Sequence, residues 1–199
     1  MSCTLFRTHN REIRHNKDLM KHLIYFIILL ILTNCNRFEK EKYDLKEKVK
    51  IDTSKIAILT YNSNDIKNKI IFGNSLNTEL SDTDLTKIEL ALKSVVDKVN
   101  IQQEKRFATL QKDYPKENYQ LSDFIINADN YKRQYIAVLN AKGEKEVLVN
   151  LFQKDIPDLK EGNWKTKIVW AHGGGLLFFK FKINLSKNKY YDVWINAEA

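Results

Sequence analysis

The hydrophobic period of this 199-residue chain changes once, and this change limits the folds that the chain can adopt. Between Ser81 and Pro115, apolar residues recur at helical spacing, which predicts one long helix over about 82–111. Ser81 or Asp82 can cap this helix, because a side-chain oxygen there accepts a hydrogen bond from a free backbone N–H. From Phe124 onward the period is two, which is typical of strands with one buried face.

Five segments after the helix have strand patterns. Residues 131–141 and 145–153 predict a hairpin that turns at Gly143, because glycine permits a positive φ. The other three segments are 164–171, 175–185 and 189–199. The alternation in "GLLFFKFKINL" predicts two different faces. The inward apolar face has Leu177, Phe179, Phe181 and Ile183. The outward polar face has Lys180, Lys182 and Asn184.

Two shorter segments before the helix, "KIAILTYN" (55–62) and "KIIF" (69–72), also have the composition of strands. We therefore predict an α+β domain in which one long helix packs on a curled antiparallel sheet of four to five strands. This order of elements is similar to that of cystatin-like and NTF2-like folds.

Residues 23–32, "LIYFIILLIL", form an uncharged apolar run that Lys21 and His22 precede. As a helix, the run would be about 15 Å long, which is about half the thickness of a bilayer core. It is apolar on every side and so lacks the polar face of a surface helix. Its length and its basic flank are typical of a secretory signal peptide rather than of a membrane span.

The run ends in "Leu-Thr-Asn-Cys" (32–35), which resembles the lipobox of bacterial lipoproteins. The resemblance implies cleavage before Cys35, a thioether between its sulfur and a diacylglycerol, and acylation of its amine. Asn34 departs from the small residue that is usual at this position of a lipobox. An ordinary cleaved signal and an uncleaved anchor are the alternatives. Several acyl chains give durable membrane attachment, whereas a single chain does not.

These features divide the chain into three segments. Residues 1–34 are the predicted signal segment, in which we expect translation to start at Met20, because a lipoprotein signal normally begins close to its apolar run. Residues 35–54 are highly charged and predict a lipidated tether, and residues 55–199 are the α+β domain. We expect the mature protein to lie at the bacterial cell envelope, attached to a membrane and facing the periplasm or the cell surface.

Residues 131–152 and 173–199 also resemble a group of small bacterial lipoproteins. In that group a strand of the form Tyr-Lys-Arg-Gln-Tyr-Ile-Ala-Val precedes a Gly-Gly segment, and an aromatic strand and Tyr-Tyr-Asp follow. The resemblance covers roughly residues 80–199 and implies a shared fold and export. It implies no activity.

The net charge of +8 comes with lysines and acids interspersed along the chain, which predicts a solvated surface. A nucleic-acid partner is not expected, because a basic stripe or a recognisable binding module is missing from the sequence. The three glycines at 173–175 lead into a strand, whereas a phosphate-binding loop leads into a helix. We therefore predict a bend or a bulge at these glycines and no cofactor.

Few residues suggest chemistry. His172 is the only histidine after the predicted signal segment, and the sequence offers it no second histidine as a metal ligand and no evident catalytic partner. We predict no catalytic residue and no metal site, and we name His172 as a candidate binding residue. Lys132 and Arg133, next to Tyr131 and Tyr135, are a candidate cation–aromatic face. The alternative is that this face is the solvent side of a strand.

The sequence therefore favours a non-catalytic binding or interaction module, held to the membrane by acyl chains on Cys35 and acting on an envelope protein. One alternative is a small-ligand-binding protein or a hydrolytic enzyme that uses a cavity between helix and sheet near His172. Such a cavity needs convergent polar groups on inward-facing positions, where this sequence places aromatic and aliphatic side chains. A purely structural envelope component is a third class.

Overall fold

The computed structural model describes residues 41–44, 49–156 and 163–197. The predicted signal segment (1–34) and Cys35 lie outside the described residues, as does the rest of the predicted tether before residue 41. Our statements about the fold concern the described residues.

The predicted long helix is confirmed as α3 (Asp82–Asp113). Its N-terminus has a capping box: the Ser81 hydroxyl accepts a hydrogen bond from the Asp84 backbone N–H, and the Asp84 carboxylate accepts one from the Ser81 N–H. The same carboxylate lies 2.8 Å from the Lys145 ammonium at the start of a central strand. The start of the helix is therefore tied to the sheet that it covers.

One sheet contains all the described strands. Its order is β1 (Glu41–Lys42), β7 (Lys189–Ile195), β6 (Phe178–Asn184), β5 (Lys145–Gln153), β4 (Tyr131–Leu139) and β2 (Ile56–Leu59). A seventh strand, β3 (Leu76–Asn77), pairs with the end of β4, at residues that β2 does not reach. The predicted antiparallel sheet of four to five strands is therefore wrong in two respects: the described sheet has seven strands, and β2 and β4 are parallel. The chain passes through two helices between these strands, and such a crossover lets them run in the same direction.

Three other expectations need correction. Residues 69–72, predicted as a strand, belong to helix α2 (Ile66–Phe72). Residues 164–171, also predicted as a strand, begin in a short 3-10 helix (Asn163–Lys165) and continue without regular structure. Part of the predicted tether contributes β1, which pairs with β7, and Tyr43 beside it is buried in the core.

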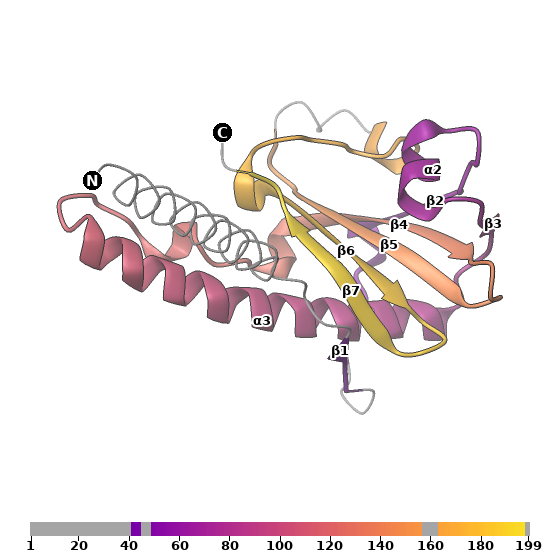
Figure 1. The fold of residues 1–199 in the computed structure, drawn as a ribbon, viewed down its shortest axis with the longest axis horizontal. Helices are drawn as coiled ribbons and strands as arrows, with labels where there is room; N and C mark the ends of the chain where they lie inside the picture. The colour runs from indigo at the N-terminus through magenta and orange to yellow at the C-terminus, as the bar shows by residue number, and fades with distance from the viewer. Residues whose placement is uncertain (1–40, 45–48, 157–162, 198–199) are drawn as a thin grey trace, which may run out of the picture. The chain divides into compact units, whose positions relative to one another are not determined.

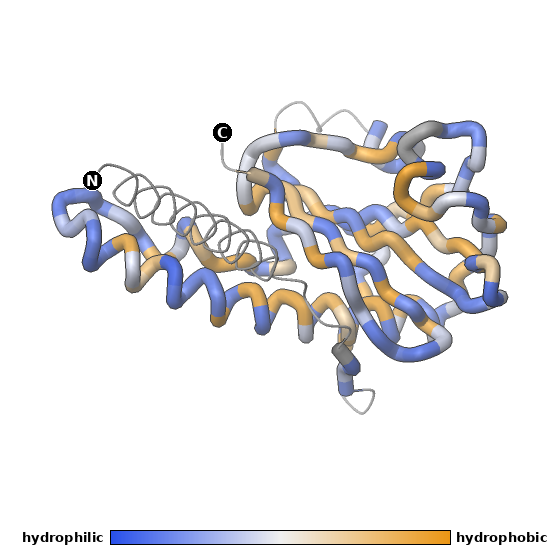
Figure 2. Tube along the Cα trace, viewed as in Figure 1, coloured by the Kyte–Doolittle hydropathy of each residue, from blue (hydrophilic) through white to orange (hydrophobic). Residues whose placement is uncertain are grey.

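The first core lies between α3 and the sheet (Figure 1). The predicted inward positions Phe179, Phe181 and Ile183 are buried in it, whereas Leu177 lies in a 3-10 turn before β6 and is 40% exposed. The buried residues of α3 lie between Ile88 and Gln103, and the far end of the helix is mostly hydrophilic (Figure 2). The helix–sheet interface is therefore filled with apolar and aromatic side chains.

A second core covers the opposite face of the sheet. Ile136, Leu148 and Phe152 of the sheet pack there with Trp164 and with apolar residues of α2. The domain therefore has three layers: α3, the sheet, and a thinner layer of α2 with the segment 163–178. The alternation of polar and apolar residues in the strands predicted that the face of the sheet opposite the long helix is exposed to solvent. This prediction is wrong, because the second core covers that face.

One buried ionic group crosses the first core. The Arg133 guanidinium lies 2.6 Å from a carboxylate oxygen of Glu89 on α3, and the Tyr135 hydroxyl donates to the other oxygen at 2.5 Å. The side chains of Arg133 and Glu89 are only 6% and 7% exposed. Burial, with the Glu89 charge beside it, raises the pKa of Tyr135 well above its usual value, so its hydroxyl stays protonated as a donor.

We expect Glu89→Gln to lower the free energy of unfolding by about 3–5 kcal/mol, because the Arg133 charge would stay buried without its partner. Urea unfolding, followed by circular dichroism, measures this change. The matched control is Asp97→Asn on the same helix, since Asp97 forms an exposed ion pair with Lys93. The control should change stability by about 0.5 kcal/mol or less. Equal losses in the two variants would contradict the assigned role of Glu89.

Candidate functional site

A polar row crosses the face of the sheet that lies opposite α3. Gln134 of β4 pairs with Asn150 of β5, Asn150 with Lys180 of β6, and Lys180 with Trp194 of β7. These residues occupy one level of four neighbouring strands, so their side chains lie in a line across the sheet. The row places two amides, one ammonium and one indole next to each other.

The two amides hold the segment that follows Asn163 against the sheet. The Gln134 side-chain N–H₂ donates to the backbone oxygens of Trp164 at 2.5 Å and Lys167 at 2.7 Å. Its oxygen accepts from the Val169 N–H at 2.8 Å and from the Asn150 amide at 3.0 Å. Gln134 is fully buried, so these bonds replace those that water would supply.

Asn150 completes this network and fixes the position of Trp170. Its amide also donates to the Val169 backbone oxygen at 2.9 Å. Trp170 follows directly, and its ring centroid lies 4.0 Å from the Lys180 Nζ. The Trp194 ring lies on the neighbouring strand, 5.9 Å from the same nitrogen. Both distances are within the range of cation–π attraction.

These rings and the Lys180 ammonium line a cavity of about 380 Å³, which we call the tryptophan–lysine pocket. Its other walls come from α2, from the segment 171–172 and from the end of β7, through Ile70, Ile71, Leu148, Ala171, His172, Lys182, Ile195, Asn196 and Ala197. The pocket therefore lies between the sheet and α2, not between the sheet and α3.

Lys182 holds α2 at the edge of this pocket. Its ammonium donates to the Ile71 backbone oxygen at 2.8 Å and lies 3.5 Å from the Asp192 carboxylate. Asp192 has a φ of 51° at an irregularity in the pairing of β6 and β7, a backbone conformation that is rare for a non-glycine residue. Ile71 lines the pocket, and Asp192 lies on β7 outside its lining. Both partners belong to the fold itself, so Lys182 acts as a structural tie.

Lys180 differs from Lys182 in its partners. Among the described residues, none offers a carboxylate within ion-pair distance of the Lys180 ammonium, and its recorded contacts are with the two indole rings. Burial lowers the pKa of Lys180 from its usual value, because water solvates the charged form less well there. The pocket thus contains a half-buried cation with an incomplete set of polar partners.

His172 lies at the exposed rim of the tryptophan–lysine pocket. The Asn196 amide holds the backbone on both sides of it, donating to the Ala171 oxygen at 2.8 Å and to the Gly173 oxygen at 3.1 Å. Gly174 follows with a φ of 87°, and a Cβ there would approach the Phe178 ring to 3.1 Å. The glycine segment is therefore a tight bend into β6.

The structure separates the other two candidate residues. Arg133 lies in the first core with Tyr131 and Tyr135, while Lys132 lies on the opposite face, where its ammonium is 5.1 Å from the Trp164 ring centroid. Successive residues of a strand point to opposite faces, so Lys132 and Arg133 cannot share one binding face. Neither residue lines the tryptophan–lysine pocket.

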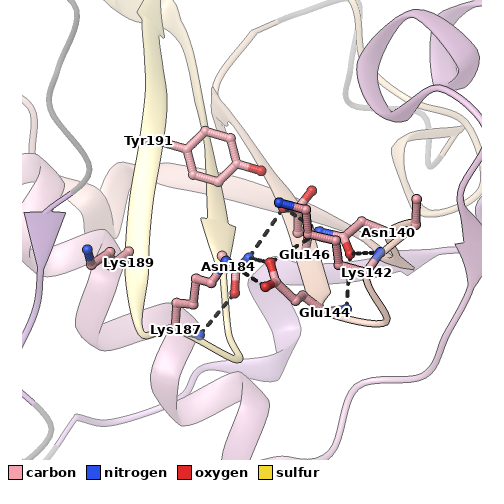
Figure 3. A pocket seen from close by; sticks show the side chains of 9 residues that line it. Asn140, Lys142, Glu144, Glu146, Asn184, Lys187, Lys189 and Tyr191 are labelled. Atoms are coloured by element: carbon pink, nitrogen blue, oxygen red, sulfur yellow. Dashed lines mark hydrogen bonds and ion pairs between the residues drawn. The ribbon is translucent and has the colours of Figure 1, made fainter.

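A second polar cluster joins the two hairpin turns (Figure 3). The Asn184 amide donates to Glu144 at 2.8 Å, and the Asn140 amide donates to Glu146 at 3.0 Å. A hydrogen bond from Lys187 is the main cause that lowers the pKa of Glu144 to about 2. The Lys187 ammonium lies 2.5 Å from this carboxylate. Because the cluster supplies its own donors and charges, we assign it a role in connecting the hairpins.

The described residues lack two further features. They contain no group of three or more His, Cys, Asp or Glu side chains with the arrangement of a metal site. In the described part of the chain, no helix has the length and apolar character that crossing a bilayer requires.

Comparison of the chain with protein-family models, with curated proteins and with solved structures gave no match. The arguments for a function therefore rest on the sequence and on the geometry of the domain itself.

Sequence reasoning identified His172 but missed Lys180, Trp170 and Trp194 as parts of one site. It placed Lys180 on the outward polar face of a strand and connected it with neither tryptophan. The pair of lysines in "FFKFKIN" could have indicated the site. Aromatic rings that cover such lysines stabilise their ammonium groups by cation–π attraction and pack on their aliphatic stems.

We expect Gln134→Leu to loosen the segment 163–170, because its backbone groups at Trp164, Lys167 and Val169 would lose their partners. Trypsin should then cleave after Lys165 and Lys167 about tenfold faster than in the wild type. Mass spectrometry of the early fragments measures this rate. Gln102→Leu is the control, since Gln102 is exposed on α3. An unchanged cleavage rate in Gln134→Leu would show that other contacts hold the segment.

Proposed function

We propose that this protein is a non-catalytic binding module that is anchored by lipid to the bacterial cell envelope and faces the periplasm or the cell surface. The observation that carries the binding part is the tryptophan–lysine pocket. It combines a preformed cavity, exposed apolar side chains and a half-buried ammonium with few polar partners. Concave sites with mainly apolar walls and a few placed polar groups are typical of ligand-binding sites.

The anchoring part of the proposal is based on the sequence. The short apolar run, its basic flank and the lipobox-like ending at Cys35 support export and lipidation. An envelope protein partner stays a prediction from the sequence.

The element order supports a finer proposal for the fold. One long helix followed by the consecutive antiparallel strands β4, β5, β6 and β7 is the order of cystatin-like and NTF2-like folds. We propose that the domain is a variant of this group, extended by the short strands β1, β2 and β3 and by α2. The parallel pairing of β2 with β4 is the main difference from an antiparallel sheet.

The second candidate function is a hydrolytic enzyme that uses His172, and the place of this residue at the pocket rim is the observation in its favour. A catalytic histidine needs a group that orients its ring and a nucleophile within hydrogen-bond reach. Among the described residues, none forms a hydrogen bond with the His172 ring. We therefore prefer binding.

We expect Cys35→Ala to abolish metabolic labelling of the protein with palmitate, since only the thiol of Cys35 forms the thioether that precedes acylation. Autoradiography of the purified protein measures the label. Cys3→Ala is the matched control and should be labelled like the wild type. Unchanged labelling of Cys35→Ala would overturn the lipoprotein proposal, and it would leave the pocket as it is.

We expect the protein purified from its native envelope to retain a small molecule that Trp194→Ala does not retain. Trp194 is 41% exposed at the pocket, so its loss removes a contact surface without opening the core. Native mass spectrometry detects the retained mass. Recovery of the compound unchanged after incubation supports binding, and conversion to a product supports the enzyme. Equal retention by both proteins would exclude this pocket as the binding site.

A further inference from the structure

The charge of Lys180 points to the class of ligand. An ammonium carries three N–H donors, and an aromatic ring attracts the charge without offering a lone pair to those donors. Lys182, on the same strand, meets this need with the Ile71 oxygen and the Asp192 carboxylate. Lys180 has no such acceptor among the described residues, although burial already disfavours its charge.

Apolar surface lies beside this ammonium. Trp194 and Ile70, which line the same cavity, are 41% and 76% exposed. Large apolar side chains that stay exposed around a cavity mark a surface that a ligand can cover. An indole ring presents a flat face, which matches a flat apolar group better than a branched one.

Resting on the binding function proposed above, we infer that the ligand is a small molecule with one anionic group, a carboxylate or a phosphate, on a flat apolar body. The anionic group accepts hydrogen bonds from the Lys180 ammonium, and the body lies against Trp194 and Ile70. The cavity of about 380 Å³ is within the usual range for small-molecule sites, about 300–1,000 Å³. His172, at the rim, is a further donor to the anion.

The inference is tested with three probes of the same shape: 2-naphthoate, 2-naphthyl phosphate and the neutral 2-naphthamide. Binding is followed by nuclear magnetic resonance of the indole N–H groups of the ¹⁵N-labelled protein. We expect an anionic probe to shift the signals of Trp170 and Trp194 and to bind at least about tenfold more tightly than 2-naphthamide. The relative affinities of the carboxylate and the phosphate identify which anion the pocket prefers.

Lys180→Met should remove this preference for the anion, and Lys180→Arg should keep most of it, because the positive charge remains. Lys132→Met is the matched control. Lys132 also lies over a tryptophan on the same face of the sheet, but outside the pocket, so this variant should bind like the wild type. If Lys180→Met does not fold, the comparison of anionic and neutral probes on the wild type still decides the matter.

Two results would overturn the inference. One is that the pocket binds 2-naphthamide as tightly as it binds the anions, while retention of an envelope compound still depends on Trp194. The binding function would then stand, and the anionic class of ligand would be wrong. The other is that none of the three probes shifts an indole signal at about 10 mM. The affinity of the pocket for these probes would then be too weak for a small-molecule site. The retention experiment tests the binding function itself. If the wild-type protein purified from its native envelope retains no more of a small molecule than Trp194→Ala does, the proposed function fails.

Discussion

The hydrogen bonds of Gln134 and Asn150 are the interaction on which the outer layer of this domain depends. A segment that lies across a sheet cannot join its ladder, so its backbone groups need other partners. The two amides supply both donors and acceptors at one place, to Trp164, Lys167 and Val169. Trp170 comes directly after this anchored stretch, and its ring therefore covers Lys180. The pocket follows from this arrangement.

The hydrophobic period of the sequence correctly predicted the long helix and the four consecutive strands that follow it. The helix α3, its cap at Ser81 and the strands β4 to β7 agree with the pattern, because each repeats a contact with one core. Residues 164–171 have the composition of a strand, yet their backbone bonds go to side chains that are distant in the sequence. Periodicity contains no information about such partners, and short apolar runs such as 69–72 suit a helix equally well.

The candidate site depends on register, which the sequence alone did not define. Gln134, Asn150, Lys180 and Trp194 belong to four different strands and meet only because the strands pair at one level. The sequence grouped Lys132 with Arg133 because they are adjacent in the chain, but adjacency in a strand places them on opposite faces. His172 was recognised by its chemical type, and its place at a pocket rim required the fold.

The two faces of the sheet treat a buried cation in different ways, and this contrast bears on why Lys180 is a lysine. On the α3 side, Arg133 has the Glu89 carboxylate as its partner, and Tyr135 satisfies the other carboxylate oxygen. On the opposite side, Lys180 has aromatic rings and no carboxylate within ion-pair distance among the described residues. An apolar side chain at this position would pack against the same rings without the desolvation cost of a charge. Cation–π attraction to the two rings offsets part of that cost but supplies no hydrogen-bond acceptor. An anionic ligand in the pocket would supply the acceptor that the described residues do not.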